Sequence, residues 1–307
     1  MIMKKLISEV KGAKCRIGFP EAEDERILKA VNKALKNEMI IPVFIGKKDK
    51  IIEKINELNL KELKNVEIIN IDEDKLQYAC KLLNENKIQG IIAGAVYTSK
   101  KVLIDTIKLI GTEEGNNTIS SFFLMYIPEW EGGENSHLIL ADCAVNINPS
   151  EDRLADIAIS TAKSAKKLFN WDPRIAMLSF STKGSASHEM IDKIRNATEL
   201  AKGKVPDLKI DGEIQADSAL KLETAKRKMT DVGEVAGKAN ILIFPDLNSA
   251  NISHKLIEIL SKGAEAYGPI LQGTRKPISD LSRGATEEDI YGTITIVCKK
   301  ILSEEKI

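Results

Sequence analysis

The ten-residue run Asp280–Asp289, D-L-S-R-G-A-T-E-E-D, brings a hydroxyl, a cation and several carboxylates together in a 307-residue chain. Arg283 could hold a phosphate, because a guanidinium presents a planar pair of donors that matches phosphate oxygens. Apolar residues at helical spacing follow the run, so the N-terminus of a helix would add its dipole to such a site. Thr286 and Asp289, three residues apart, equally resemble a capping box. The residues alone leave a helix cap and a phosphate-handling site about balanced.

A second candidate site is the segment S-F-S-T-K-G-S-A at residues 179–186. It follows an apolar run typical of a strand and precedes an expected helix, where backbone N–H groups and the helix dipole suit a phosphate. The spacing of a Walker A loop is absent. A simple turn with a capping serine explains the segment equally well. The residues that would bind phosphate are Ser181, Thr182, Lys183, Gly184 and Ser185.

Two other sets of residues are weaker candidates for chemistry. Asp211, Glu213 and Asp217 cluster in D-G-E-I-Q-A-D and could hold a divalent cation, although turn, capping and ion-pair roles are the favoured interpretation. The three histidines do not form the pattern of a catalytic triad, and no G-x-G-x-x-G follows the first expected strand. We therefore expect neither a metal site nor an ordinary dinucleotide site.

The overall composition is that of a soluble globular protein. Lysine plus arginine and aspartate plus glutamate balance at 45 each, so the net charge favours neither nucleic acid nor an anionic membrane as partner. The four cysteines are widely separated, which is typical of buried thiols in a reducing compartment. The first residues lack the apolar core of a signal peptide, and no apolar run approaches the length of a membrane helix. We expect a cytoplasmic protein.

Short apolar runs alternate with longer amphipathic ones along the chain. Helical spacing is clear at 27–35, 48–57, 76–83, 99–110 and 151–168, and strands are expected at 14–19, 41–45, 66–71, 91–96, 118–126, 137–142, 174–180, 208–212, 240–245 and 264–269. Strands separated by helices predict an α/β fold with a mostly parallel sheet, in which ligands bind at the carboxyl ends of strands. The length predicts two domains, and the glycine- and asparagine-rich stretch 113–117 is the expected crossing between them.

Several long motifs occur together and in order. They are F-P-E-A-E-D-E-R, G-A-V-Y-T-S, I-S-S-F-F-L-M, M-L-S-F-S-T-K-G-S-A, I-D-G-E-I-Q-A-D, N-I-L-I-F-P-D-L-N-S and A-Y-G-P-I-L-Q-G-T-R-K-P-I-S-D-L-S-R-G. With these motifs the chain closely resembles the phosphate acetyltransferases, within the wider phosphate acetyltransferase and butyryltransferase family. The resemblance covers nearly the whole chain and is weak only between about 47 and 88.

The resemblance implies two three-layer α/β/α domains with mostly parallel sheets and an active-site cleft between them. The first domain would be 1–115 plus 272–307 and the second 116–271. Members of the family are commonly homodimers. They use no metal and no cofactor as a catalytic group, since coenzyme A is a substrate.

The implied reaction transfers an acetyl group between acetyl phosphate and coenzyme A by direct attack of the thiolate on the carbonyl carbon. Carried onto this sequence, Asp289 takes the thiol proton, Ser282 donates a hydrogen bond in the transition state, and Arg283 holds the phosphate. A thiol has a pKa of about 8.5 and an aspartate about 3.9, a gap worth about 6 kcal/mol. Either burial raises the pKa of the base, or the proton moves only as the carbon–sulfur bond forms.

Two departures from the family pattern affect the phosphate side. Ile104 occupies the position where the family usually has an arginine, and a second family arginine falls in a segment that this chain lacks between 72 and 88. Lys183, Arg275 or Lys276 could replace the lost charge. The alternatives are a phosphate acyltransferase for longer acyl groups such as butyryl, a paralogue that binds coenzyme A or a phosphorylated metabolite without efficient catalysis, and a metal- and nicotinamide-dependent dehydrogenase of similar shape.

Overall fold

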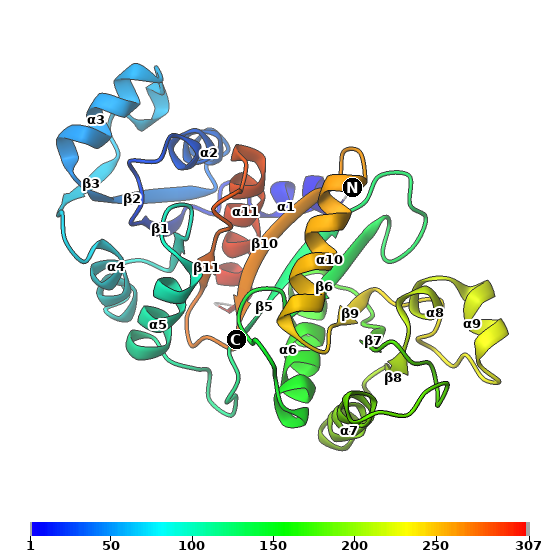
Figure 1. The fold of residues 1–307 in the computed structure, drawn as a ribbon. Coiled ribbons are helices and arrows are strands. Elements are labelled where there is room, and N and C mark those ends of the chain that lie inside the picture. Colours follow the sequence, from blue (N-terminus) through cyan, green and yellow to red (C-terminus); the bar gives the residue numbers. More distant parts are fainter. Residues whose placement is uncertain (1, 305–307) are drawn as a thin grey trace. The chain divides into compact units, whose positions relative to one another are not determined.

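The computed structural model describes residues 2–304, and their contacts divide the chain into two compact units. Unit 1 contains the residues up to Gly115 together with those from Tyr267 onward, and unit 2 runs from Asn116 to Ala266. Figure 1 shows the elements of both units coloured along the sequence.

The sheet of unit 1 has the strand order β3-β2-β1-β4-β11-β10. Neighbouring strands are parallel except for β11, which is antiparallel to β10. Because β1, β4 and β11 run side by side in one direction, the segments that follow them emerge at the same edge of the sheet. The strands are β1 (Cys15–Phe19), β2 (Ile40–Gly46), β3 (Glu67–Asn70), β4 (Gly90–Ala93), β10 (Glu265–Gln272) and β11 (Ile278–Asp280).

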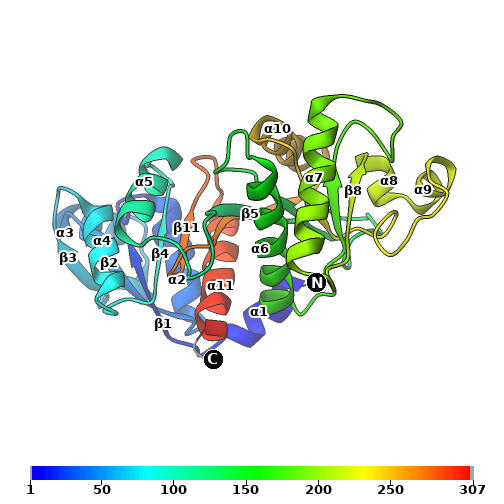
Figure 2. The same ribbon diagram turned by 90° about the horizontal axis from the view of Figure 1, so that it is seen from below.

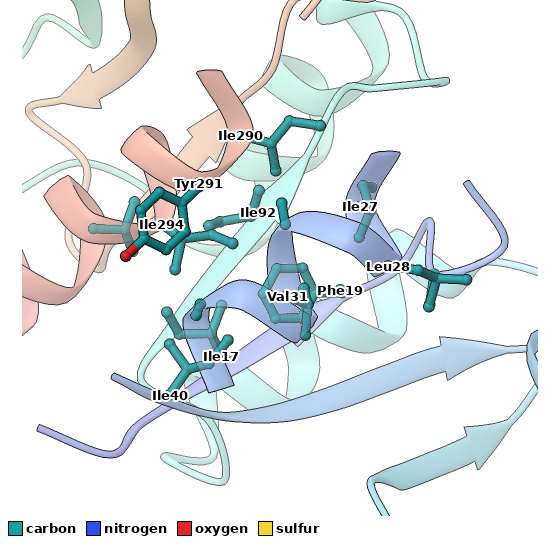
Figure 3. Packing of buried hydrophobic residues seen from close by; sticks show 14 of the residues in the cluster. Ile17, Phe19, Ile27, Leu28, Val31, Ile40, Ile92, Ile290, Tyr291 and Ile294 are labelled. Carbon is teal, nitrogen blue, oxygen red and sulfur yellow. The ribbon is translucent and has the colours of Figure 1, made fainter. Parts of the chain in front are cut away.

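Helices cover both faces of this sheet. The helices are α1 (Ile2–Val10), α2 (Glu25–Lys36), α3 (Lys48–Glu57), α4 (Lys75–Asn84), α5 (Ser99–Leu109) and α11 (Glu287–Glu304), with a 3-10 turn at Lys61–Leu63. On one face, α11 packs against α1 and α2, while α4 and α5 pack together on the other. Figure 3 shows side chains of α2 and α11 meeting those of β1, β2 and β4.

Unit 2 has the strand order β5-β6-β9-β7-β8, in which only β5 and β6 pair antiparallel. Figure 2 shows α6 and α7 side by side on one face, and α8, α9 and α10 contribute to the core of the other face. The strands are β5 (Ser120–Tyr126), β6 (His137–Ala141), β7 (Ile175–Leu178), β8 (Ile210–Ile214) and β9 (Ile241–Ile243); the helices are α6 (Glu151–Phe169), α7 (Glu189–Lys204), α8 (Ala216–Leu220), α9 (Leu222–Lys228) and α10 (Leu247–Leu260).

These elements confirm the predicted α/β class, its mostly parallel strand pairing, and each strand and helix that periodicity had indicated, within a few residues at their ends. Periodicity missed β11, which is only three residues long, and α1 at the start of the chain. The helix expected after the 179–186 segment is α7, which begins at Glu189 with His188 as its N-cap. The 181–185 segment is therefore a loop that does not itself form a helix N-terminus.

None of the helices in residues 2–304 has the length and apolar character needed to cross a membrane. All four cysteines are buried free thiols, as their spacing had indicated.

The packing of α11 against α2 can be tested at Ile294, a fully buried residue in the core that the two helices share. Ile294→Ala should lower the free energy of unfolding by about 2–5 kcal/mol, because it removes buried methyl groups and leaves a cavity. Ile52→Ala on α3 is the matched control, since Ile52 is 39% exposed and its truncation should cost far less. Urea denaturation followed by circular dichroism measures both, and equal losses would contradict this packing.

Candidate active site

The Arg26 side chain ties together three segments at the carboxyl edge of the unit 1 sheet. Its Nε and Nη2 atoms donate to both carboxylate oxygens of Asp24, the N-cap of α2, at 3.1 and 2.7 Å. Nη2 also donates to the carbonyl of Ala95 after β4, at 3.0 Å. Nη1 donates to the carbonyls of Arg283 and Ala285 after β11, at 2.8 and 3.0 Å. One guanidinium thus fixes the turn that carries Ser282 and Arg283.

The predicted capping box is confirmed at the start of α11. The Oδ2 atom of Asp289 accepts hydrogen bonds from the backbone N–H and the hydroxyl of Thr286 at 2.8 and 2.7 Å. In return the Thr286 hydroxyl accepts from the Asp289 N–H at 3.2 Å. Asp289 is nearly buried, and none of the residues in 2–304 donates a hydrogen bond to its Oδ1 atom. The box therefore orients the carboxylate and leaves one oxygen available.

Ser282 and Arg283 differ in the hydrogen bonds that their side chains already form. The Ser282 hydroxyl oxygen accepts a hydrogen bond from the Gly284 N–H at 3.3 Å, which leaves its proton free to be donated. The guanidinium of Arg283 is exposed and forms no hydrogen bond or ion pair with any residue in the described range. This cation is free to meet an anionic ligand.

The backbone N–H groups of the loop that follows β4 bind a side-chain carboxylate of the protein instead of a ligand. Glu21, which follows β1 and is only 4% exposed, accepts hydrogen bonds from the four successive N–H groups of residues 94–97. A row of N–H groups like this one is a ready anion site. Because Glu21 fills it, a phosphate cannot use this loop unless the glutamate leaves.

In unit 2, the predicted phosphate loop is also closed by internal hydrogen bonds. All six N–H groups of residues 181–186 donate within the unit, to side chains of Ser179, Ser181, Ser185 and Glu213 or to backbone carbonyls. The ammonium group of Lys183 forms an ion pair with Asp211. As the structure stands, neither this backbone nor Lys183 is free to hold a phosphate, so that role stays a prediction.

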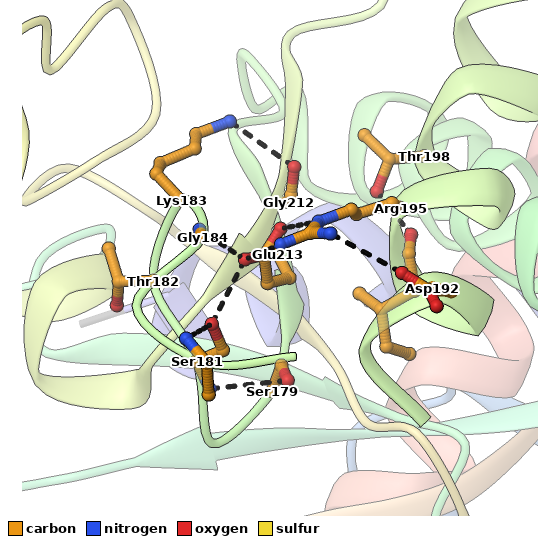
Figure 4. Close-up of polar contacts among 12 residues, drawn as sticks. Ser179, Ser181, Thr182, Lys183, Gly184, Asp192, Arg195, Thr198, Gly212 and Glu213 are labelled. Atoms are coloured by element: carbon orange, nitrogen blue, oxygen red, sulfur yellow. Dashed lines mark hydrogen bonds and ion pairs between the residues drawn. The ribbon is translucent and has the colours of Figure 1, made fainter. Parts of the chain in front are cut away.

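Glu213 is the centre of this closed loop, as Figure 4 shows. Its carboxylate is only 2% exposed and accepts hydrogen bonds from the Ser181 hydroxyl at 3.0 Å, the Gly184 N–H at 2.8 Å, and the Nε and Nη2 atoms of Arg195 at 2.8 and 3.0 Å. Burial alone would raise the pKa of Glu213, but the hydrogen bonds from Arg195, Gly184 and Ser181 outweigh it and lower that pKa to about 2. Glu213 therefore works as a structural anion.

Comparison with known proteins identifies the family. Residues 1–78 and 71–298 match the family described as phosphate acetyl/butaryl transferase. The chain belongs to this family. It is 42% identical to a phosphate acetyltransferase of Clostridium acetobutylicum, over 92% of this chain and 93% of that protein. It is 38% identical to the phosphate acetyltransferase of Bacillus subtilis, over 96% and 97%. A phosphotransacetylase structure from Streptococcus pyogenes superposes with a TM-score of 0.87 at 34% identity, covering 98% of both chains.

Ile104, where the resemblance predicts a family arginine, lies on α5. Ile104 is 39% exposed there, so the position is open to solvent although it lacks a charge. Lys101, the cation one turn earlier, pairs with Asp105 at 3.1 Å and lies over the ring of Tyr97. This part of α5 therefore presents an apolar side chain at the position where the resemblance predicts a cation.

Arg275 and Lys276 lie at the opposite edge of the sheet from Ser282. Arg275 donates to the Asn84 side chain at 3.2 Å, and Lys276 donates to the Leu83 carbonyl at 2.9 Å and to the Asn86 side chain. Residues 83–86 end α4 and lead into β4, so these contacts mark the amino end of the sheet. The structure does not bring these two cations together with Arg283, and the function proposed below does not depend on them.

The three carboxylates that the sequence offered as metal ligands each form an ion pair with a different basic side chain. Asp211 pairs with Lys183, Glu213 with Arg195, and Asp217 with Lys228. Residues 2–304 contain no group of three or more histidine, cysteine or acidic side chains placed to hold a metal ion. Each carboxylate thus has an ion-pair role, one of the structural roles that the sequence favoured.

The histidines make contacts within the fold. His188 caps α7, and His254 is buried and stacked on Phe123 with ring centroids 4.4 Å apart. Burial lowers the pKa of His254 to about 4 and also lowers the pKa of His137.

Sequence reasoning missed Arg26 and Glu21 and named Asp280 only as the start of the candidate run; all three lie at the carboxyl edge of unit 1 and contact segments distant along the chain. The only available signal was their presence in long motifs: Glu21 and Arg26 both lie in F-P-E-A-E-D-E-R, and Asp280 immediately precedes L-S-R-G.

The low pKa of Glu213 predicts how the stability of unit 2 depends on pH. The folded pKa is about 2 and the usual value is 4.5, so the stabilisation is complete above pH 4.5 and is lost as pH falls toward 2. The loss amounts to about 3 kcal/mol at about 1.4 kcal/mol for each pKa unit. Glu213→Gln should be less stable at neutral pH and should lose less of its unfolding free energy across that interval.

Urea titrations at a series of pH values test this prediction, with the exposed Glu199→Gln on α7 as the control. Parallel pH curves for Glu213→Gln and the unchanged protein would contradict it.

Proposed function

We propose that this chain is a phosphate acetyltransferase, which transfers an acetyl group between acetyl phosphate and coenzyme A. The observation that carries the proposal is the single turn in which Arg283, Ser282 and Asp289 are held by Arg26 and by the capping box. The near full-length similarity to phosphate acetyltransferases supports the choice of substrates. The acetyl group is the expected acyl group, and longer acyl phosphates are the alternative.

Arg283 binds the phosphate of the acyl donor in this mechanism. Its guanidinium is exposed and unpaired among the described residues, and a guanidinium can donate two parallel hydrogen bonds to phosphate oxygens. As the carbon–oxygen bond breaks, negative charge collects on the leaving phosphate. A cation already in place stabilises that charge more strongly in the transition state than in the ground state.

Asp289 acts as the base for the coenzyme A thiol. Thr286 occupies its Oδ2 atom, so Oδ1 is the atom that accepts the proton. The sulfur attacks the carbonyl carbon, the thiol proton goes to Oδ1, and phosphate leaves with the electron pair of the broken carbon–oxygen bond. Because a thiol is a much weaker acid than a carboxylic acid, the proton moves as the carbon–sulfur bond forms. The Ser282 hydroxyl donates to the oxygen that gains charge.

Several finer expectations from the family resemblance remain proposals. These are a cleft between two domains as the active site, a role of Ser181–Ser185 in binding phosphate, and function in the cytoplasm, which the four buried free thiols support.

The decisive experiment measures thioester formation from coenzyme A with acetyl, propionyl and butyryl phosphate. We expect the highest kcat/KM with acetyl phosphate. Asp289→Asn should lower kcat by about 10²- to 10⁴-fold, which is the range for loss of a general base, with little change in the KM for acetyl phosphate. Glu288→Gln is the matched control, because Glu288 is exposed and pairs only with Lys33 across the surface.

No turnover with any of the three acyl phosphates would reject the proposed function. Full activity in Asp289→Asn would reject the proposed base while leaving the family unchanged.

We also propose that the protein is a homodimer that pairs through one face of α10. Ile252, Leu256, Ile259 and Leu260 are 50–78% exposed, and their spacing places them on one side of the helix, away from buried Ala250 and His254. The family resemblance selects a second copy of this chain as the partner for this apolar stripe.

Leu256→Lys should convert the dimer to a monomer in sedimentation velocity, because it places a charge in a desolvated interface. Ile52→Lys on α3 places the same charge on another exposed isoleucine and should leave the dimer intact. An unchanged sedimentation coefficient for Leu256→Lys would contradict this interface.

A further inference from the structure

Asp280 is a buried carboxyl group that the mechanism above does not use. It ends β11, two residues before Ser282, and it is fully buried. Neither of its oxygens has a hydrogen-bond partner among the described residues. A methyl group placed on Gly94 would lie 2.4 Å from Oδ1, so this carboxyl packs directly against the loop that follows β4.

The donors of that loop are already committed to another carboxylate. Glu21 accepts the N–H groups of residues 94–97, and the backbone N–H of Leu281 donates to the Ala93 carbonyl at 2.6 Å. A charge on Asp280 would therefore stand in a buried site beside the Glu21 carboxylate, with the Ser99 hydroxyl but none of these backbone N–H groups to compensate it. An unpaired buried charge is so costly that the group takes up a proton instead.

The other elements packed on β11 offer little that would stabilise a negative charge on Asp280. β4 has no ionisable side chain, α5 brings the Ser99 hydroxyl and a Lys101 that is paired with Asp105, and the first turn of α11 brings Asp289, which is held by Thr286. The guanidinium of Arg26 is committed to Asp24 and to three carbonyls.

Burial and the Glu21 charge raise the proton affinity of Asp280 by more than the Ser99 hydroxyl lowers it. Burial raises the pKa of Asp280, the Ser99 hydroxyl acts in the opposite direction, and the Glu21 charge raises it further, to about 7. Because the folded protein holds this proton and the unfolded chain releases it near 3.8, the free energy of unfolding falls as pH rises from 3.8 to about 7.

We propose that Asp280 is a positioning residue that functions as a neutral carboxylic acid, and that loss of its proton displaces the turn carrying Ser282 and Arg283. The reason is mechanical. An ionised Asp280 repels Glu21 across Gly94, and the segments after β4 and β11 are the two that Arg26 holds together. The consequence for turnover rests on the proposed acetyltransferase function, whereas the protonation state itself does not.

The protonation state is measured first, by infrared difference spectroscopy of the unchanged protein over a pH series. We expect the C=O band of a neutral carboxylic acid to persist at pH 6 and to disappear with a midpoint near 7, where exposed carboxyl groups have long been ionised. Asp280→Asn should lack this band. Asp142→Asn should keep it, because this substitution leaves Asp280 in place and changes another buried aspartate, one that accepts hydrogen bonds from Ser121 and Asn146.

The second measurement is the pH dependence of kcat for acetyl phosphate and coenzyme A. Asparagine has the shape of the neutral acid and cannot ionise, so Asp280→Asn should stay within about threefold of the unchanged protein at pH 6. The pH at which kcat falls on the alkaline side should be at least one unit higher in this variant.

An absent infrared band at pH 6 would overturn the proposal even if Asp280→Asn failed to fold. An unchanged alkaline limb in a folded Asp280→Asn would overturn it as well, and loss of activity at every pH would show that the ionised carboxylate is needed. If the unchanged protein turned over none of the acyl phosphates, the proposed function would fail, while the infrared result would still decide the state of Asp280.

Discussion

The guanidinium of Arg26 is the contact on which the candidate site depends. A parallel sheet brings the segments after β1, β4 and β11 to one edge, but it does not fix their loops, because loops lack the regular hydrogen bonds of the strands. Arg26 supplies fixed bonds between them, from a planar group whose donors meet Asp24 and three carbonyls. This set of bonds fixes the turn that carries Ser282 and Arg283, as the proposed site requires.

Internal carboxylates are the second constraint on the site. In unit 1 Glu21 fills the row of N–H groups at residues 94–97, and in unit 2 Glu213 closes the 181–185 loop. Both loops have features that suit phosphate, yet both are satisfied within the protein. The gain is rigidity, because a buried carboxylate with several donors fixes each loop in one conformation. In the proposed function the substrate phosphate is therefore met first by Arg283, whose guanidinium is exposed and unpaired among the described residues.

Much of the fold was predictable because its signals are local. Alternation of apolar and amphipathic runs identified the strands and most helices, and the threonine–aspartate spacing identified the cap of α11. The failures have physical causes as well. β11 is too short to show a period, and it forms only because β4 and β10 lie on either side of it. The loop before α7 resembled a helix N-terminus, but the hydrogen bonds of Glu213 hold it as a separate turn.

The sequence by itself determined the α/β class, the family through its ordered motifs, and the identity of Ser282, Arg283 and Asp289 as the residues to examine. Only the tertiary structure decided which polar groups are already engaged. Within residues 2–304 it showed Asp289 with one oxygen that accepts no hydrogen bond, Lys183 paired with Asp211, Arg275 and Lys276 at the far edge of the sheet, and Asp280 buried beside the Glu21 carboxylate. The reason is that spacing along the chain fixes local geometry, whereas the free energy of a charged group depends on burial and on neighbours brought in from distant segments.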